Sequence, residues 1–140
     1  MNFLLDTNIL SELIRPQPHP AVIGWLQAQP ETAYYFSVVT LSELAFGVAR
    51  LPEGQRKAQM QDWLSRDLQQ RFIGRILPVS DAVGLCCGEL RAIRQSCGRP
   101  LALADGLIAA TAASHAMSLV TRNTKDFEEL GLDLINPWQI

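Results

Sequence analysis

Four acidic residues, Asp6, Glu43, Asp105 and Asp126, are the side chains of this sequence best suited to chemistry. They are separated by 37, 62 and 21 residues, and no cluster of histidine, cysteine or lysine accompanies them. Carboxylate oxygens without nitrogen or sulfur ligands favour a hard divalent cation such as Mg²⁺. The pattern therefore indicates phosphate chemistry rather than acyl transfer or redox chemistry.

The elements around these acids predict an α/β fold, with a central, mostly parallel sheet flanked by helices. Apolar and β-branched runs predict strands at residues 3–5, 33–38, 118–121 and 132–135, and a short strand or connector at 75–79. Apolar residues at helical spacing predict helices at 7–14, 21–28, from Thr40 to the break at Pro52, 53–72, from the cap Ser80 to Gly98, and 104–116. Strands that alternate with helices form a parallel sheet through right-handed crossovers, and helices cover both of its faces.

In such a sheet, ligands bind beyond the carboxyl ends of the strands. Asp6 directly follows the first predicted strand, and Glu43 comes a few residues after the second. Asn123 and Asp126 follow the strand at 118–121, and Asp105 lies near the start of its helix. The sequence therefore predicts that all four acids converge on one edge of the sheet.

Taken singly, these acids have structural alternatives. Asp6 could cap the helix that follows it. Thr40 and Glu43 fit a capping box, and a helix start at Asn123 could account for the last acid. Asp105 lies in an apolar setting, where an unpaired acid is costly. Four acids at one edge would repel each other and raise their own pKa values, and a bound Mg²⁺ or Mn²⁺ would relieve that repulsion.

Composition sets the remaining limits. The 140 residues are 48% hydrophobic, which suits one packed domain. A net charge of −2 argues against binding nucleic acid by bulk charge, although ten of the twelve basic residues are arginines, which suit phosphate partners. Three cysteines without zinc spacing, two of them adjacent, favour reduced thiols and a cytoplasmic location. No apolar run approaches the roughly 18 residues of a membrane span, and no glycine-rich phosphate loop is present.

Four segments resemble the signature blocks of PIN-domain ribonucleases. They are Leu4–Glu12, Ser42–Leu44, Ala104–Ala112 and Thr121–Phe127. The chain looks in particular like the VapC-type toxins of bacterial type II toxin–antitoxin pairs, and Asn136–Trp138 resembles the FitB-like branch. Each block alone is modest, but four in this order and spacing are specific, and the match covers essentially all of residues 1–140 as a single PIN-like domain.

The resemblance implies a PIN-like three-layer sandwich and a set of site residues. Asp6, Glu43 and Asp105 match the three family acids. Asp126 is expected as the fourth acid, with Asn123 helping to position water or metal. Hydroxyls at positions 7 and 121, both threonine, match family positions that help to order the site. The family also implies a homodimer and a VapB-type antitoxin that covers the acidic pocket and supplies the contact with operator DNA.

The function implied is Mg²⁺- or Mn²⁺-dependent hydrolysis of RNA phosphodiester bonds. Asp6 and Asp105 would bind the metal, with Glu43 and Asp126 binding directly or through water. Arginines such as 91, 94 and 122 could steer the RNA backbone. Two alternatives stay open: a receiver-like module with a phosphorylated aspartate, which would want a lysine near a late strand, and a non-catalytic subunit whose acids attract a basic partner.

Overall fold

A computed structural model describes residues 1–140. Its centre is one sheet of five parallel strands in the order β3-β2-β1-β4-β5. The strands are β1 (Phe3–Leu5), β2 (Tyr34–Ser37), β3 (Ile76–Leu77), β4 (Ser118–Val120) and β5 (Leu134–Ile135). The predicted α/β fold with a parallel sheet is therefore confirmed.

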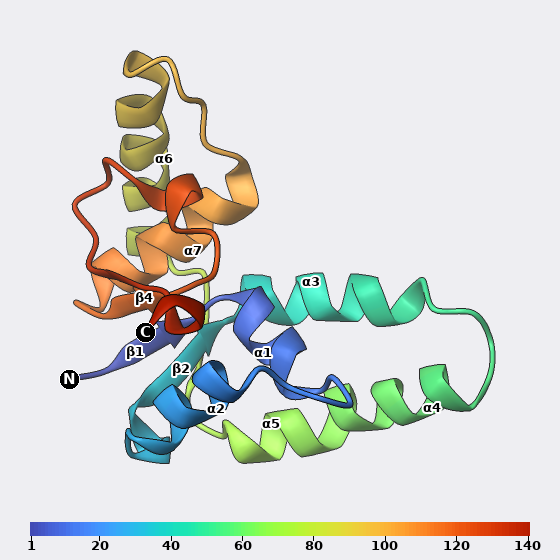
Figure 1. Ribbon diagram of the computed structural model, residues 1–140. Helices are drawn as coiled ribbons and strands as arrows, with labels where there is room; N and C mark the ends of the chain where they lie inside the picture. Colours follow the sequence, from blue (N-terminus) through green and yellow to red (C-terminus); the bar gives the residue numbers. More distant parts are fainter.

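The chain forms seven α-helices. They are α1 (Thr7–Leu13), α2 (Pro20–Gln27), α3 (Val38–Ala49), α4 (Gln55–Asp62), α5 (Leu68–Arg71), α6 (Asp81–Ser96) and α7 (Leu103–Ser114). In Figure 1, α6 and α7 lie on one side of the sheet, and α1, α2 and α5 lie on the other. None of the helices combines the length and apolar character that crossing a bilayer requires.

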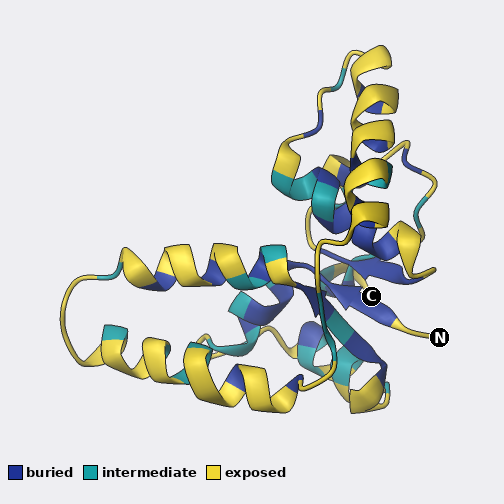
Figure 2. Ribbon diagram, turned by 180° about the vertical axis from the view of Figure 1, so that it is seen from behind, coloured by how far each residue is buried: buried dark blue, intermediate teal, exposed yellow.

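The alternation of side chains along the strands divides the core in two. Leu4 and Leu119 face a cluster formed with α6 and α7, while Phe3, Leu5 and Val120 face a cluster formed mainly with α1, α3 and α5. None of these five side chains is more than 4% exposed. Figure 2 shows buried residues on the sheet and on the helix faces turned toward it. This arrangement is a three-layer sandwich, as expected.

The alanine-rich helix α7 packs closely against α6, as its composition predicts. A Cβ at Gly106 would lie 2.9 Å from the Cys87 sulfur and 3.1 Å from Cγ of Arg91. Ala109, Ala110 and Ala112 are fully buried. The close approach fixes the start of α7, which carries Asp105.

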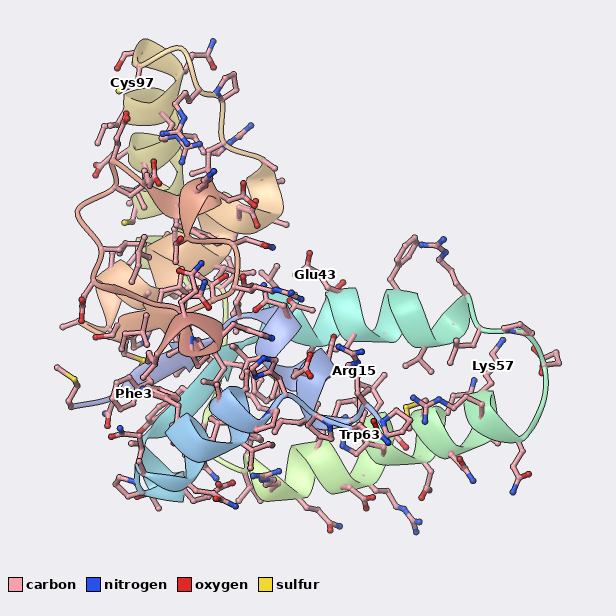
Figure 3. All side chains as sticks on the ribbon, viewed as in Figure 1. Phe3, Arg15, Glu43, Lys57, Trp63 and Cys97 are labelled. Atoms are coloured by element: carbon pink, nitrogen blue, oxygen red, sulfur yellow. The ribbon has the colours of Figure 1, made fainter.

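Helices α3 and α4 form an arm that projects away from the sheet (Figure 1). Toward its outer end, Lys57 donates to the carbonyl of Ala49 at 3.1 Å and pairs with Glu53 at 2.8 Å (Figure 3). At its base, Trp63 packs against the core cluster on the α1 side. Within the arm, α3 packs against both α1 and α4.

Three local expectations were wrong in detail. Helix α3 begins at Val38 rather than Thr40, because the Ser37 hydroxyl accepts the Val39 amide at 3.0 Å and caps the helix earlier. The long helix expected at 53–72 starts at Gln55 and contains a π-helical turn at Trp63–Asp67. The turn at Thr124–Phe127 is a 3₁₀ helix whose first position receives no side-chain cap from Asn123.

Candidate active site

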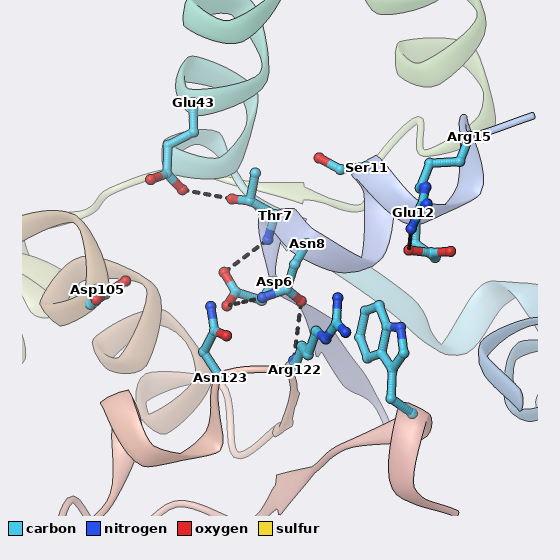
Figure 4. A pocket seen from close by; sticks show the side chains of 11 residues that line it. Asp6, Thr7, Asn8, Ser11, Glu12, Arg15, Glu43, Asp105, Arg122 and Asn123 are labelled. Carbon is cyan, nitrogen blue, oxygen red and sulfur yellow. Dashed lines mark hydrogen bonds and ion pairs between the residues drawn. The ribbon is translucent and has the colours of Figure 1, made fainter. Parts of the chain in front are cut away.

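A pocket of about 410 Å³ opens at the carboxyl ends of β1 and β4 (Figure 4). The strand order reverses here, since the chain runs from β1 to β2 on one side and places β4 on the other. Such a switch point is where open parallel sheets bind ligands. Asp6, Glu43 and Asp105 all line this pocket. The structure thus brings together three of the four predicted acids.

Asp6 is fixed at both of its carboxylate oxygens. Its Oδ1 accepts the Thr7 amide at 2.8 Å, and its Oδ2 accepts the Thr121 hydroxyl at 2.8 Å. Asn8 Nδ2 approaches the same Oδ2 at 3.4 Å. Burial raises the pKa of Asp6, the hydrogen bonds from Thr121 and Thr7 lower it in part, and the charges of Glu43 and Asp126 raise it further. The net pKa lies above its ordinary value, so Asp6 lacks a compensating positive charge.

Glu43 projects from α3 toward α1 and does not cap its own helix. Its Oε1 accepts the Thr7 hydroxyl at 2.6 Å, and that hydroxyl lies 3.3 Å from the hydroxyl of buried Thr40. The capping-box alternative is therefore wrong, because Thr40 lies inside the helix and Ser37 occupies the cap position. Thr7 instead connects two of the acids: its amide binds Asp6 and its hydroxyl binds Glu43.

Asp105 lies in the first turn of α7, and its side chain makes no hydrogen bond. Burial raises its pKa to about 6, and the charges of Asp6, Asp126 and Glu43 add to the rise. Only Arg94 opposes these effects. A half-buried carboxylate without any hydrogen-bond partner, surrounded by other acids, has no structural role that would offset its cost.

Asp126, unlike the other three acids, does not line the acidic pocket. It is exposed and lines an adjacent hollow, whereas Asn123 lines the acidic pocket itself and points toward Asp6 in Figure 4. The Asn123 amide donates to the Thr121 hydroxyl at 3.0 Å, which ties the turn to β4. Asp126 still raises the pKa values of Asp6 and Asp105 through its charge.

The three arginines expected to steer RNA occupy different environments. Arg94 is 5% exposed and donates to the carbonyls of Arg99, Asp126 and Glu128, so it supports the turn that carries Asp126 and does not face a groove. Arg91 donates to the Leu101 carbonyl at 3.1 Å beside α7. Arg122 lines the acidic pocket.

Sequence reasoning missed several residues of the pocket wall, among them Asn8, Glu12 and Trp138. Asn8 shares its amide between Asp6 and Thr121, and its Oδ1 accepts the Arg122 amide at 3.2 Å. The one sequence signal that could have identified Asn8 as a pocket residue is its position two residues after Asp6. Trp138 lies more than 100 residues from β1, and only the pairing of β4 with β5 brings it near.

The donor set fits a hard divalent cation. The pocket wall offers carboxylate, hydroxyl and amide oxygens, and it contains no cysteine, histidine or lysine. The structure contains no group of three acidic, histidine or cysteine side chains close enough together to bind one ion. Mg²⁺ needs few direct carboxylates because it keeps several water ligands, so a pair of acids suffices. The missing lysine also disfavours the receiver-like alternative: Lys125 is exposed and lies outside this wall.

Comparisons with known proteins agree with the fold. Residues 3–132 match the PIN domain family. The VapC ribonuclease Y4jK of Sinorhizobium fredii is 40% identical over 97% of both chains. The toxin FitB of Neisseria gonorrhoeae is 38% identical over 96% of this chain and 97% of its own. The crystal structure of FitAcB from the same bacterium superposes with a TM-score of 0.93 over 99% of each chain, at 38% identity.

The parallel α/β fold and the family match over residues 3–132 define a PIN domain. The chain belongs to the PIN domain family, and within it to the group of VapC and FitB toxins.

Proposed function

We propose that this protein is a metal-dependent endoribonuclease and the toxin of a toxin–antitoxin pair, built as one PIN-like domain over residues 1–140. The observation that carries the proposal is Asp105, a half-buried carboxylate without a hydrogen bond whose pKa is raised to about 6 beside two further acids. The relatives named as ribonucleases support the same reaction class.

Asp6 and Asp105 would hold Mg²⁺ or Mn²⁺, with Glu43 and Asp126 binding directly or through water. When bound, such a cation lowers the pKa of a ligand water and neutralises charge on phosphoryl oxygens. The chain's own contribution is orientation. Thr121 and Thr7 hold the oxygens of Asp6, and Thr7 holds Glu43 at 2.6 Å. Asn123 would help to place a water in the pocket.

We also propose a VapB-type antitoxin as partner. An apolar groove of about 220 Å³ between α1, α3 and α4 adjoins the acidic pocket and shares Thr7, Ser11 and Glu43 with it. An antitoxin segment would pack apolar side chains against Leu44 and Met60 and set a basic side chain over the acids. Other solved structures with this fold are toxin–antitoxin complexes, one of them bound to promoter DNA.

Operator DNA would be contacted through the antitoxin alone, because this chain carries a net charge of −2. A homodimer and a cytoplasmic location complete the proposal. The homodimer follows from the family resemblance, and the location follows from the three free cysteines.

The test is cleavage of fluorescent single-stranded RNA by the full chain freed of any co-purified partner. We expect cleavage in Mg²⁺ or Mn²⁺ and none in EDTA. Asp6→Asn should lower the rate by at least about 100-fold. Asp62→Asn, at an exposed acid of α4 that pairs with Arg66, is the matched control and should cleave normally. Wild-type rates in Asp6→Asn would refute the mechanism, and no cleavage by the wild type would favour the non-catalytic alternative.

A further inference from the structure

Arg122 is held from three directions at the rim of the acidic pocket. Its backbone amide donates to Asn8 Oδ1 at 3.2 Å, and its carbonyl accepts Asn136 Nδ2 at 3.3 Å. Its guanidinium carbon lies 5.1 Å from the centroid of the Trp138 ring. Arginine side chains lose conformational entropy when they bind, and a stacked guanidinium has already lost part of it. The side chain is therefore preorganised.

The hydrogen-bond donors of the Arg122 guanidinium are nevertheless unoccupied. It makes no hydrogen bond and no ion pair, although it lies beside a pocket lined by carboxylates. The other arginine of this wall, Arg15, is paired with Glu12 at 3.2 Å. Of the two, only Arg122 has all five N–H donors available to a ligand.

The ring under Arg122 is itself anchored. The Trp138 amide donates to Asn136 Oδ1 at 3.0 Å, and the indole packs against the core cluster on the α1 side. Asn136 thus binds both the arginine and the turn that carries the tryptophan. In Figure 4, Asp6 lies between Asp105 on one side and Arg122 on the other. A single RNA strand that crosses the pocket would pass first over the acids and then over the Arg122 guanidinium.

We propose that Arg122 is an anion site for the RNA phosphate next to the one that is cleaved, and that Trp138 is the positioning residue that holds it there. This inference rests on the proposed ribonuclease function. A polyanion entering a pocket with three carboxylates is repelled, and a chain of net charge −2 offers no bulk attraction. A preorganised guanidinium supplies a local, bidentate attraction for a phosphodiester.

The experiment measures binding and cleavage separately. Fluorescence anisotropy follows a labelled single-stranded oligoribonucleotide in Ca²⁺ over a range of salt concentrations, and steady-state cleavage in Mg²⁺ gives kcat and KM. Arg122→Ala should weaken binding about tenfold. It should also reduce the slope of log affinity against log salt by about 0.7, the value for one phosphate contact on a single strand. KM should rise about tenfold, with kcat within about twofold of wild type.

Arg50→Ala is the matched control. Arg50 stacks on Phe46 of α3 at the same 5.1 Å but lies outside the acidic pocket. Its removal should therefore leave the RNA affinity, the salt slope and KM unchanged. Arg122→Lys keeps the charge and should retain the salt slope while losing part of the affinity. Trp138→Leu should reproduce part of the loss of RNA binding seen in Arg122→Ala. Trp138→Phe keeps an aromatic ring under the guanidinium and should bind RNA like the wild type. Melting curves identify any variant that fails to fold.

The outcomes separate the two proposals. If the wild type neither binds nor cleaves RNA, the proposed function fails, and this inference fails with it. If the wild type does both and Arg122→Ala matches Arg50→Ala, only the present inference is overturned. A polyglutamate peptide tests the alternative that Arg122 binds an acidic protein segment. If Arg122→Ala no longer binds the peptide but still binds RNA with wild-type affinity, the site serves such a segment and the RNA assignment is wrong.

Discussion

Asp105 should destabilise the metal-free protein, and Asp105→Asn should therefore stabilise it. Its pKa rises from an ordinary 3.8 to about 6, chiefly through burial and then through the charges of neighbouring acids. At about 1.4 kcal/mol for each tenfold change in proton affinity, the upper limit is about 3 kcal/mol. Because the side chain is only half-buried, solvent screening reduces this to about 1–2 kcal/mol.

The sign follows from proton linkage. Between about pH 4 and pH 6 the folded state holds a proton on Asp105 that the unfolded state has released, so stability falls as the pH rises through this window. Asp105→Asn does not lose stability in this way, because asparagine has no proton to release. Its gain in free energy of unfolding over the wild type should be complete at pH 7.5 and should vanish near pH 4.

Urea denaturation in EDTA at pH 7.5, 6.0 and 4.5 measures the effect. Glu89→Gln, at an exposed glutamate of α6 without ion pairs, is the control and should leave stability unchanged. An Asp105→Asn protein no more stable than wild type at pH 7.5 would refute the reasoning. An advantage that persists unchanged at pH 4.5 would trace it to packing rather than charge. Added Mg²⁺ should close the gap, since ligand binding stabilises only the folded wild type.

Three further results are expected. Thr121→Val removes the buried donor to Asp6 and should cost about 1–3 kcal/mol in urea denaturation at pH 7.5; an unchanged midpoint would contradict the contact. Arg94→Met removes the buried donor of three part-buried hydrogen bonds, one of them to the carbonyl of Asp126, and should cost about 1–3 kcal/mol, with a matching loss of cleavage. The Mg²⁺ concentration needed for half-maximal cleavage by the wild type should rise as the pH falls below about 6, because a proton on metal-free Asp105 competes with the cation; a concentration unchanged from pH 5 to 8 would exclude that cause.

The strands and most helices could be predicted because their signals are local. Phe3–Leu5 is a compact apolar run, Ser80 caps α6 through the Val83 amide, and Gly98 adopts a φ of +72° after that helix. The register of the sheet could not be read from the sequence. It depends on pairings such as Phe3 with Ser118, which join segments far apart in the chain.

The site was predictable in its residue types and less so in their contacts. Glu43 and Thr40 carry the sequence pattern of a capping box, yet the carboxylate turns to Thr7, 36 residues away in sequence. A local motif cannot reveal a partner from another helix, so the sequence around Glu43, taken alone, favoured the cap. Arg94 is the converse case. Its charge suggested a surface role, but its position on the buried face of α6 gives it backbone carbonyls as partners.

An aspartate after a strand can be a helix cap or a metal ligand, and the arrangement at Asp6 is compatible with both roles. A capping side chain usually accepts an amide from the second or third residue of its helix. Asp6 accepts that of Thr7, the first residue, while Thr121 binds its other oxygen. The two bonds fix the carboxylate plane between β1 and β4, with 6% of the residue exposed. An ordinary cap requires neither the second bond nor a pocket lined by two further acids. The cap therefore positions the carboxylate, and its burial beside two further acids, which raises its pKa, supports the cation proposed for this pocket.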